Sequence, residues 1–80
     1  MARVRLLYFA SLREAAGRDA EEFDTAAADL AGLYAEVAAR HALAWPRAHL
    51  RVAVDGAFAD WGAALRDGSE VAFIPPVSGG

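Results

Sequence analysis

The sequence contains no cysteine and no lysine. Without cysteine the chain can form neither a disulfide bridge nor a cysteine-ligated zinc site, and it has no thiol nucleophile. Its eight basic residues are all arginine and stand against eleven acidic residues, which gives a formal net charge of -3. A negatively charged protein is repelled by the phosphates of DNA and RNA, so we expect no nucleic-acid partner.

Residue types on which autonomous enzymes depend are also scarce. The two histidines, His41 and His49, lack the spacing of a metal-binding pair, so no metal site is expected. None of the three serines lies in a Gly-x-Ser-x-Gly turn, and the glycines lack the spacing of a phosphate-binding loop. The apolar run over 6–10 is too short for a signal peptide or a membrane span. We therefore expect a cytoplasmic protein that makes no membrane contact and has no catalytic machinery of its own.

Hydrophobic periodicity predicts four strands and one long helix. Apolar and charged residues alternate in the half-buried strands, whereas Leu30, Leu33 and Val37 recur at helical spacing. Asp24 or Thr25 is expected to cap the N-terminus of that helix. The expected elements are strands over 3–9, 20–24, 50–54 and 70–74, a helical turn over 10–17 and the long helix over 25–42.

Turn signals and ambiguous segments lie between these elements. Asp55-Gly56 is a strong signal for a tight turn, and residues 66–68 form another turn before the last strand. Residues 57–65 fit either a short strand with a helical turn or an irregular loop packed on the sheet. The acidic residues of the segment 20–24 fit either a solvated edge strand or a pair of carboxylates for acid–base chemistry.

The order of the elements favours the α+β class, with a mixed β-sheet wrapped around one main helix. The length of 80 residues allows a single domain, 1–80, and no second core. The strands over 3–9 and 70–74 are the most apolar and are expected to be the most buried. Propensity leaves open whether these two strands pair in parallel.

The C-terminal segment has a composition suited to a carrier arm. Pro75 and Pro76 end the last predicted strand because neither has an amide hydrogen, and together they favour an extended conformation. Residues 77–80 are small, and the final two glycines can pass through a channel too narrow for side chains. An extended tail holds its terminal carboxylate up to about 20 Å from the sheet. A partner could activate such a carboxylate as an acyl adenylate; a frayed terminus is the alternative interpretation.

Two segments of the chain closely resemble the small, sulfur-carrier subunit of molybdopterin synthase. The C-terminal segment, which is a highly specific motif, reads Phe73-Ile74-Pro75-Pro76-Val77-Ser78-Gly79-Gly80. The N-terminal segment, which is moderately specific, reads Leu7-Tyr8-Phe9-Ala10-Ser11-Leu12-Arg13-Glu14. The resemblance extends over essentially the whole chain.

This resemblance implies a ubiquitin-like β-grasp fold and a role as a sulfur carrier. An ATP-dependent activating enzyme would adenylate the carboxylate of Gly80 and convert it to a thiocarboxylate. The sulfur would then pass to precursor Z, a cyclic pyranopterin monophosphate, and form the dithiolene of molybdopterin. The resemblance further implies a heterotetramer of two small and two large subunits, with the catalytic groups on the large subunit. No cofactor is expected on this chain, because ATP is used by the activating enzyme.

The resemblance also assigns roles to individual residues. Gly80 would carry the sulfur, Gly79 would allow the tail to thread into the partner, and the residues that position the arm would be Pro75, Pro76, Val77 and Ser78. An apolar docking surface would include Phe9, Phe73 and Ile74. Arg13 would contact a partner. The alternatives are that each aromatic residue belongs to the core and that Arg13 lies on a solvated helix surface.

Three other functions remain open at this point. The thiamine-pathway sulfur carrier shares the Gly-Gly end, but it lacks the Pro-Pro-Val-Ser approach to it. A ubiquitin-like modifier would attach the same activated tail to lysines of target proteins. This chain has no lysine, so it could not form lysine-linked chains on itself, but it could still modify other proteins. A plain interaction domain with an inert tail would function without Gly80.

Overall fold

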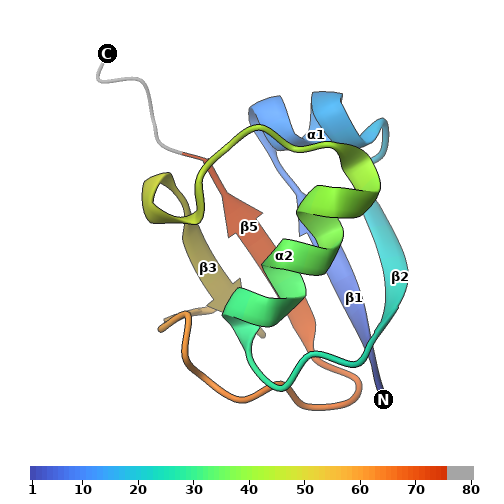
Figure 1. The fold of residues 1–80 in the computed structure, drawn as a ribbon, viewed down its shortest axis with the longest axis vertical. Coiled ribbons are helices and arrows are strands. Elements are labelled where there is room, and N and C mark those ends of the chain that lie inside the picture. The colour runs from blue at the N-terminus through green and yellow to red at the C-terminus, as the bar shows by residue number, and fades with distance from the viewer. Residues whose placement is uncertain (76–80) are drawn as a thin grey trace.

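The computed structural model describes residues 1–75 (Figure 1). Its elements in chain order are β1 (Ala2–Tyr8), α1 (Ala10–Ala16), β2 (Ala20–Thr25), α2 (Leu30–His41), the 3-10 helix η1 (Arg47–His49), β3 (Arg51–Val54), β4 (Ala57–Ala59) and β5 (Glu70–Ile74). The four predicted strands, the short helix and the long helix are all present.

The strands form one mixed sheet in the order β2-β1-β5-β3-β4. The two most apolar strands, β1 and β5, lie in its middle and run parallel, with Tyr8 opposite Phe73. The other neighbouring pairs are antiparallel. This arrangement confirms the α+β class and answers the question that strand propensity left open. It also makes β2 an edge strand beside β1, as predicted.

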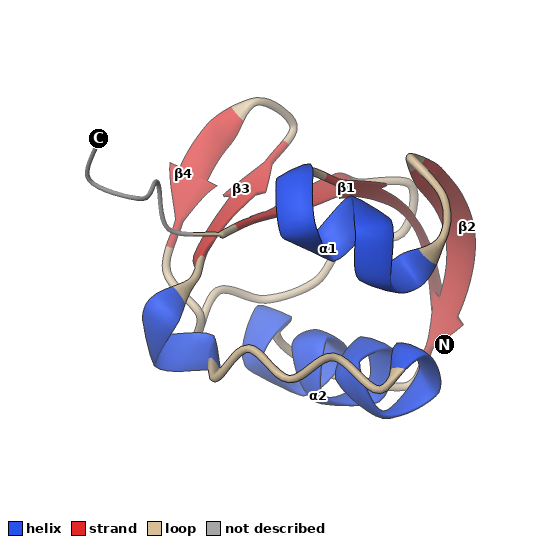
Figure 2. Cartoon of the chain, turned by 90° about the horizontal axis from the view of Figure 1, so that it is seen from above, coloured by secondary structure: helices blue, strands red, loops and turns tan. Residues whose placement is uncertain are grey.

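One face of the sheet packs against α2 (Figure 2). Successive strand residues point to opposite faces, so every second side chain of β1 and β5 enters the core. The completely or almost completely buried core residues include Val4, Leu6, Tyr8, Leu12, Leu30, Leu33, Val37, Val52, Val71 and Phe73. We call the face that points away from α2 the open face.

The long helix begins later than predicted. Asp29 is its N-cap, and its Oδ1 accepts a hydrogen bond from the N–H of Gly32 at 2.8 Å. The prediction that Asp24 or Thr25 caps this helix is therefore wrong. Both residues belong to β2, and the Thr25 hydroxyl instead accepts a hydrogen bond from the N–H of Ala27 at 3.0 Å. The chain between β2 and α2 uses a side-chain turn where a continuous helix was expected.

The segment over 57–65 combines the two predicted alternatives. Its first residues form β4, which pairs with β3 after the tight turn at Asp55 and Gly56. A hydrogen-bonded turn follows, in which the N–H of Ala63 donates to the carbonyl of Asp60 at 3.0 Å. The rest of the segment is a loop packed against the start of α2.

The short helix α1 closes one end of the core. Leu12 is its one buried residue, and Gly17 ends the helix in the left-handed conformation with φ of 77°. Among residues 1–75, no helix is long and apolar enough to cross a membrane. A five-stranded mixed sheet that covers one main helix is the ubiquitin-like β-grasp fold that the resemblance implied.

Candidate functional site

The predicted carrier tail leaves the sheet from its centre. β5 ends at Ile74, and Pro75 is buried directly after it. The arm and carrier residues Pro76, Val77, Ser78, Gly79 and Gly80 lie outside the described residues. The structure therefore defines the root of the tail, a buried strand flanked on both sides by other strands.

The sheet topology brings three chain segments together at this root. Because β1 and β5 are parallel, Phe9 follows the end of β1 beside the end of β5. β3 is antiparallel to β5, so its first residue, Arg51, lies opposite Ile74. Residues from both halves of the sequence thus meet where the tail departs.

Phe73 does not belong to this surface. Its side chain is 0% exposed. Its ring packs edge-to-face on Tyr34, with ring centroids 5.1 Å apart, and stacks against Trp61 at 6.0 Å. The prediction that Phe73 is part of the docking surface is therefore wrong, and the core alternative is right. The physical reason is strand alternation, which sends Phe73 toward α2 and its neighbour Ile74 to the open face.

Phe9 and Ile74 remain available on the open face. Phe9 is 47% exposed and has an extended backbone, so it continues the alternation of β1 and points away from the buried Tyr8. Ile74 is half-buried beside it in the sheet. The structure is thus compatible with the predicted docking role of these two residues.

Phe58 is another exposed aromatic residue, and the sequence analysis gave it no docking role. It lies on β4 opposite Ala53 and is 66% exposed. Val52 points into the core, so Ala53 and Phe58 both lie on the open face. The alternation of small and large residues in Ala57-Phe58-Ala59 could have revealed Phe58 once the segment was known to be a strand.

A groove of about 430 Å³ adjoins the root of the tail. It is lined by Ala48, His49, Leu50, Arg51, Phe58, Ile74 and Pro75. The guanidinium of Arg51 lies over the Phe58 ring, 5.4 Å from its centroid. The groove therefore joins an apolar floor to a basic rim.

Arg13 lies on α1 and is exposed. Its Nε lies 3.7 Å from Oδ1 of Asp19, and both side chains are more than half exposed. An exposed ion pair of this kind contributes little to stability and exchanges easily. A partner can therefore reach Arg13. In the isolated chain its side chain lies on a solvated helix surface, which is the alternative that the sequence left open.

The acidic segment 20–24 is not a pair of catalytic carboxylates. Asp24 and Glu22 lie on the open face, and Asp24 accepts a hydrogen bond from Arg3 Nε at 2.8 Å. Glu21 points the other way and accepts a hydrogen bond from the Tyr8 hydroxyl at 2.5 Å. Burial and this hydrogen bond raise the pKa of Tyr8 above its usual value. The interpretation as a solvated edge strand is therefore right for Glu22 and Asp24. Glu21 instead connects β2 to β1 through its hydrogen bond with Tyr8.

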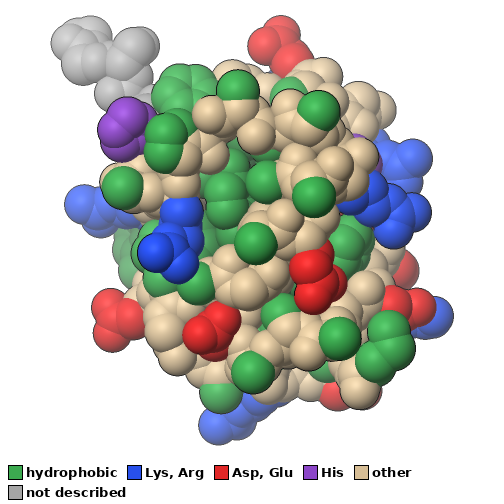
Figure 3. Space-filling model, in the orientation of Figure 1, with side chains coloured by type: hydrophobic (Ala, Val, Ile, Leu, Met, Phe, Trp, Pro, Cys, Tyr) green, Lys and Arg blue, Asp and Glu red, His purple; other side chains and the backbone are tan. Residues whose placement is uncertain are grey.

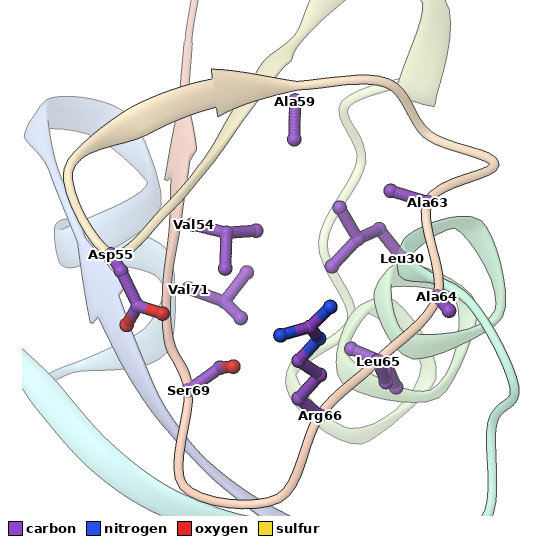
Figure 4. A pocket seen from close by; sticks show the side chains of 10 residues that line it. All are labelled: Leu30, Val54, Asp55, Ala59, Ala63, Ala64, Leu65, Arg66, Ser69 and Val71. Atoms are coloured by element: carbon purple, nitrogen blue, oxygen red, sulfur yellow. The ribbon is translucent and has the colours of Figure 1, made fainter.

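A second pocket lies at the other end of β5 (Figure 4). Its volume is about 350 Å³, and it is lined mainly by Val54, Val71 and side chains of the loop before β5. The Arg66 side chain extends into this pocket, with Ser69 and Asp55 on the opposite side. Within residues 1–75 no cluster of three metal-ligating side chains occurs.

Comparison with known proteins agrees with the predicted resemblance. Residues 6–80 match the ThiS family. The molybdopterin synthase sulfur carrier subunit of Escherichia coli (strain K12) is 39% identical over 80 residues, which covers 96% of this chain and 99% of that protein.

Solved structures share the fold. SAMP1 from Haloferax volcanii matches with a TM-score of 0.83 at 28% identity and covers 99% of this chain and 100% of its own. The protein–protein complex of subunits 1 and 2 of the molybdopterin-converting factor from Helicobacter pylori 26695 matches with a TM-score of 0.67 at 22% identity, covering 98% of this chain and 99% of that one. The family that the two terminal segments resembled is thus confirmed: the chain belongs to the ThiS family, together with the sulfur carrier subunits of molybdopterin synthase.

Proposed function

We propose that the protein is the sulfur-carrier small subunit of molybdopterin synthase and that Gly80 carries the sulfur as a thiocarboxylate. The observation that carries this proposal is the root of the tail. The buried central strand β5 ends at Ile74, and an apolar part of the open face lies beside it. The strand anchors the tail rigidly, and the face gives a partner a surface on which to dock. The relatives named above support the assignment, and the cytoplasm is its proposed location.

The chemistry begins at the terminal carboxylate. One of its oxygens attacks the α-phosphorus of ATP on the activating enzyme, and pyrophosphate leaves. A sulfur nucleophile then displaces AMP from the acyl adenylate, which leaves a thiocarboxylate on Gly80. In the large subunit this sulfur attacks precursor Z on the way to the dithiolene of molybdopterin. The chain itself holds and presents the reacting atom, and the partners supply the groups that move protons.

The docking step uses the open face. The exposed Phe9 and Phe58 and the half-buried Ile74 form an apolar group around the end of β5, and burying them in a complex removes their surface from water. Arg13 lies nearby on α1 and completes the contact. We propose that the large subunit covers this group in a heterotetramer of two small and two large subunits, and that the activating enzyme covers it in turn.

The missing cysteine makes the central claim directly testable. The protein is incubated with an activating enzyme, ATP and a sulfur source, and a thiol-selective alkylating reagent is then added. Only a thiocarboxylate can react as a thiol, because the chain has no cysteine. Mass alone is misleading, since oxidation of Met1 adds about the same 16 mass units as the exchange of oxygen for sulfur.

Fragment masses locate the label. We expect it on Gly80 alone, and only when ATP and the activating enzyme are both present. A parallel sample is mixed with the large subunit and precursor Z before the alkylating reagent is added. We expect it to produce molybdopterin and to take up no label at Gly80. An unlabelled chain in the presence of an activating enzyme that sulfurates a known carrier would overturn the proposal.

A protein modifier is the second candidate, favoured by the structural match to SAMP1, the small archaeal modifier protein 1 of Haloferax volcanii. Both functions use an activated tail, but they differ in the product. A modifier would form amide bonds to lysines of other proteins, whereas a sulfur carrier accumulates the thiocarboxylate. The same incubation with a cell extract in place of precursor Z distinguishes them, because conjugates appear as new bands of higher mass that contain the chain.

A further inference from the structure

The segment 47–51 forms a basic edge beside the root of the tail. Arg47, His49 and Arg51 alternate along η1 and the start of β3, and all three side chains are exposed. We refer to these three residues as the basic edge. The whole chain has a formal net charge of -3, so a cluster of basic side chains runs against its average composition. Figure 3 shows basic and histidine side chains on the side of the molecule from which β5 leaves the sheet.

The arginines of the basic edge differ from most other arginines in their partners. Four arginines make ion pairs with carboxylates at 2.8 to 3.8 Å, namely Arg3, Arg5, Arg13 and Arg18. In the described part of the chain, neither Arg47 nor Arg51 has a carboxylate oxygen within 4.0 Å. Asp60 lines a neighbouring groove together with Arg51, yet it forms no ion pair there.

Aromatic rings hold both guanidinium groups in place. Arg47 lies over Trp61, 6.0 Å from the ring centroid, and Arg51 lies over Phe58 at 5.4 Å. A guanidinium group that stacks on a ring is restrained in orientation, while the N–H groups at its edge remain free to donate. These N–H groups match the two oxygens of a carboxylate, so less entropy is lost when one binds.

The groove lined by His49 and Arg51 of the basic edge adds an apolar requirement. Its floor includes Leu50, Phe58 and Ile74, and it ends at Pro75. A partner segment that fills it therefore needs an apolar side chain next to one or more carboxylates. Because the groove adjoins the root of the tail, the same segment would stand at the entrance of the channel that receives the tail.

We propose that the basic edge binds an acidic segment of the large synthase subunit, in which carboxylates pair with Arg47 and Arg51 and an adjacent apolar side chain enters the groove. This inference rests on the proposed function and adds the charge and location of the contact. The basic edge fixes the register of docking before the tail enters its channel. It also steers the encounter, because exposed charges act mainly on the association rate.

The test compares charge-neutralised variants in binding to the large subunit of the same organism. The double variant Arg47→Gln, Arg51→Gln is titrated alongside wild type and Arg66→Gln. Arg66 is exposed, lies in the pocket at the other end of β5 and has no carboxylate oxygen within 4.0 Å among residues 1–75, so its substitution removes one exposed positive charge far from the basic edge. At low ionic strength we expect the double variant to bind about tenfold more weakly, with a reduced association rate and a smaller dependence on salt. Arg66→Gln should bind like wild type.

A second variant separates charge from packing. In Arg47→Lys, Arg51→Lys the charge is kept but the planar fork is lost, so we expect an affinity between those of wild type and the glutamine variant. Thermal melts of all variants show whether the loss of stacking on Trp61 and Phe58 has changed the fold.

Each outcome decides the inference. Equal affinity and salt dependence of the folded glutamine variant and wild type would overturn it, and so would an equal loss in Arg66→Gln. If the glutamine variant bound the large subunit like wild type but bound the activating enzyme more weakly, the large subunit would be the wrong partner. If the wild-type chain did not bind the large subunit at all, the proposed function itself would fail and this inference with it.

Discussion

Glu21 is a carboxylate buried among hydrogen-bonding groups. Its side chain is 7% exposed, and its Oε2 lies 2.5 Å from the Tyr8 hydroxyl and 2.6 Å from Nε2 of His41. Burial raises the pKa of a carboxyl group, but here the hydrogen bonds from Tyr8 and His41, together with the nearby Arg18 guanidinium, outweigh it and hold the pKa of Glu21 below its usual value. The folded state therefore favours the ionised form, which connects β1, β2 and the end of α2.

This arrangement predicts an acid-dependent loss of stability. A carboxyl group whose pKa is lower in the folded state stabilises the fold above its unfolded value, here about 4.5. That stabilisation is lost as the pH falls through the folded pKa. Glu21→Gln should remove part of this pH dependence and lower the free energy of unfolding at neutral pH by about 1–3 kcal/mol. Thermal melts over a pH series from about 3 to 7 measure both effects.

Glu22 provides the matched control. It is the adjacent residue, but it is exposed on the open face, and no side-chain hydrogen bond to it is found in the described residues. We expect Glu22→Gln to change the free energy of unfolding by less than about 0.5 kcal/mol. Equal destabilisation by the two variants would show that the hydrogen bonds of Glu21 contribute nothing specific.

At the scale of elements, strand alternation divides β5 between stability and binding. Phe73 packs on Tyr34 and Trp61 in the core, whereas Ile74 reaches the open face beside Phe9. Phe73→Ala should therefore lower the free energy of unfolding by about 3–5 kcal/mol. Phe9→Ala should leave the melting temperature nearly unchanged and weaken binding of the large subunit. Melting curves and titrations of both variants would contradict this division if Phe9→Ala destabilised the fold as strongly as Phe73→Ala.

The N-cap of α2 gives a second prediction at this scale. The Asp29 carboxylate accepts a hydrogen bond from the N–H of Gly32, one of the amides that the helix itself leaves unpaired. Asp29→Ala should lower the free energy of unfolding by about 1 kcal/mol. Asp24→Ala is the comparison, because Asp24 makes an exposed ion pair with Arg3 and its loss should destabilise the fold less than the loss of the N-cap. Chemical denaturation of both variants measures the difference, and a larger loss in Asp24→Ala would contradict the assigned cap.

Periodicity predicted these elements better than it predicted their ends and faces. Residues 26–28 are alanines that fit a helix, so nothing in their type shows that the Thr25 hydroxyl turns the chain before Asp29 starts α2. The face of Phe73 depends on its register with β1, which is a contact between distant parts of the chain. Local pattern therefore found where strands and helices lie, and only the sheet decided which apolar residues were free for a partner.

For the whole molecule, one part of the candidate site follows from local sequence and the other depends on the arrangement of the sheet. The tail motif could be recognised from the sequence because its prolines and glycines act through their own backbone chemistry. The docking face could be recognised only in part. The resemblance named Phe9 and Ile74, but Phe58 and Arg51 join them only through the strand order β1-β5-β3-β4. Under the proposed function, the reacting atom belongs to the C-terminal tail and the recognition surface belongs to the sheet.

The separation of arm from sheet leads to a prediction about the length of the chain. Deletion of Gly80, or addition of one residue after it, leaves every described contact in place and should leave the melting temperature unchanged. Both changes move the carboxylate by about 3.3 Å along an extended arm, and a displacement of this size removes it from the alignment that the reaction requires. Sulfur transfer should therefore be lost while binding of the large subunit through the open face persists.

Gly79→Ala keeps the length but adds a Cβ where the tail threads, so it should slow transfer without abolishing docking. Single-turnover transfer and titration on the same samples measure the two steps separately, and normal transfer by the extended chain would refute the role of Gly80.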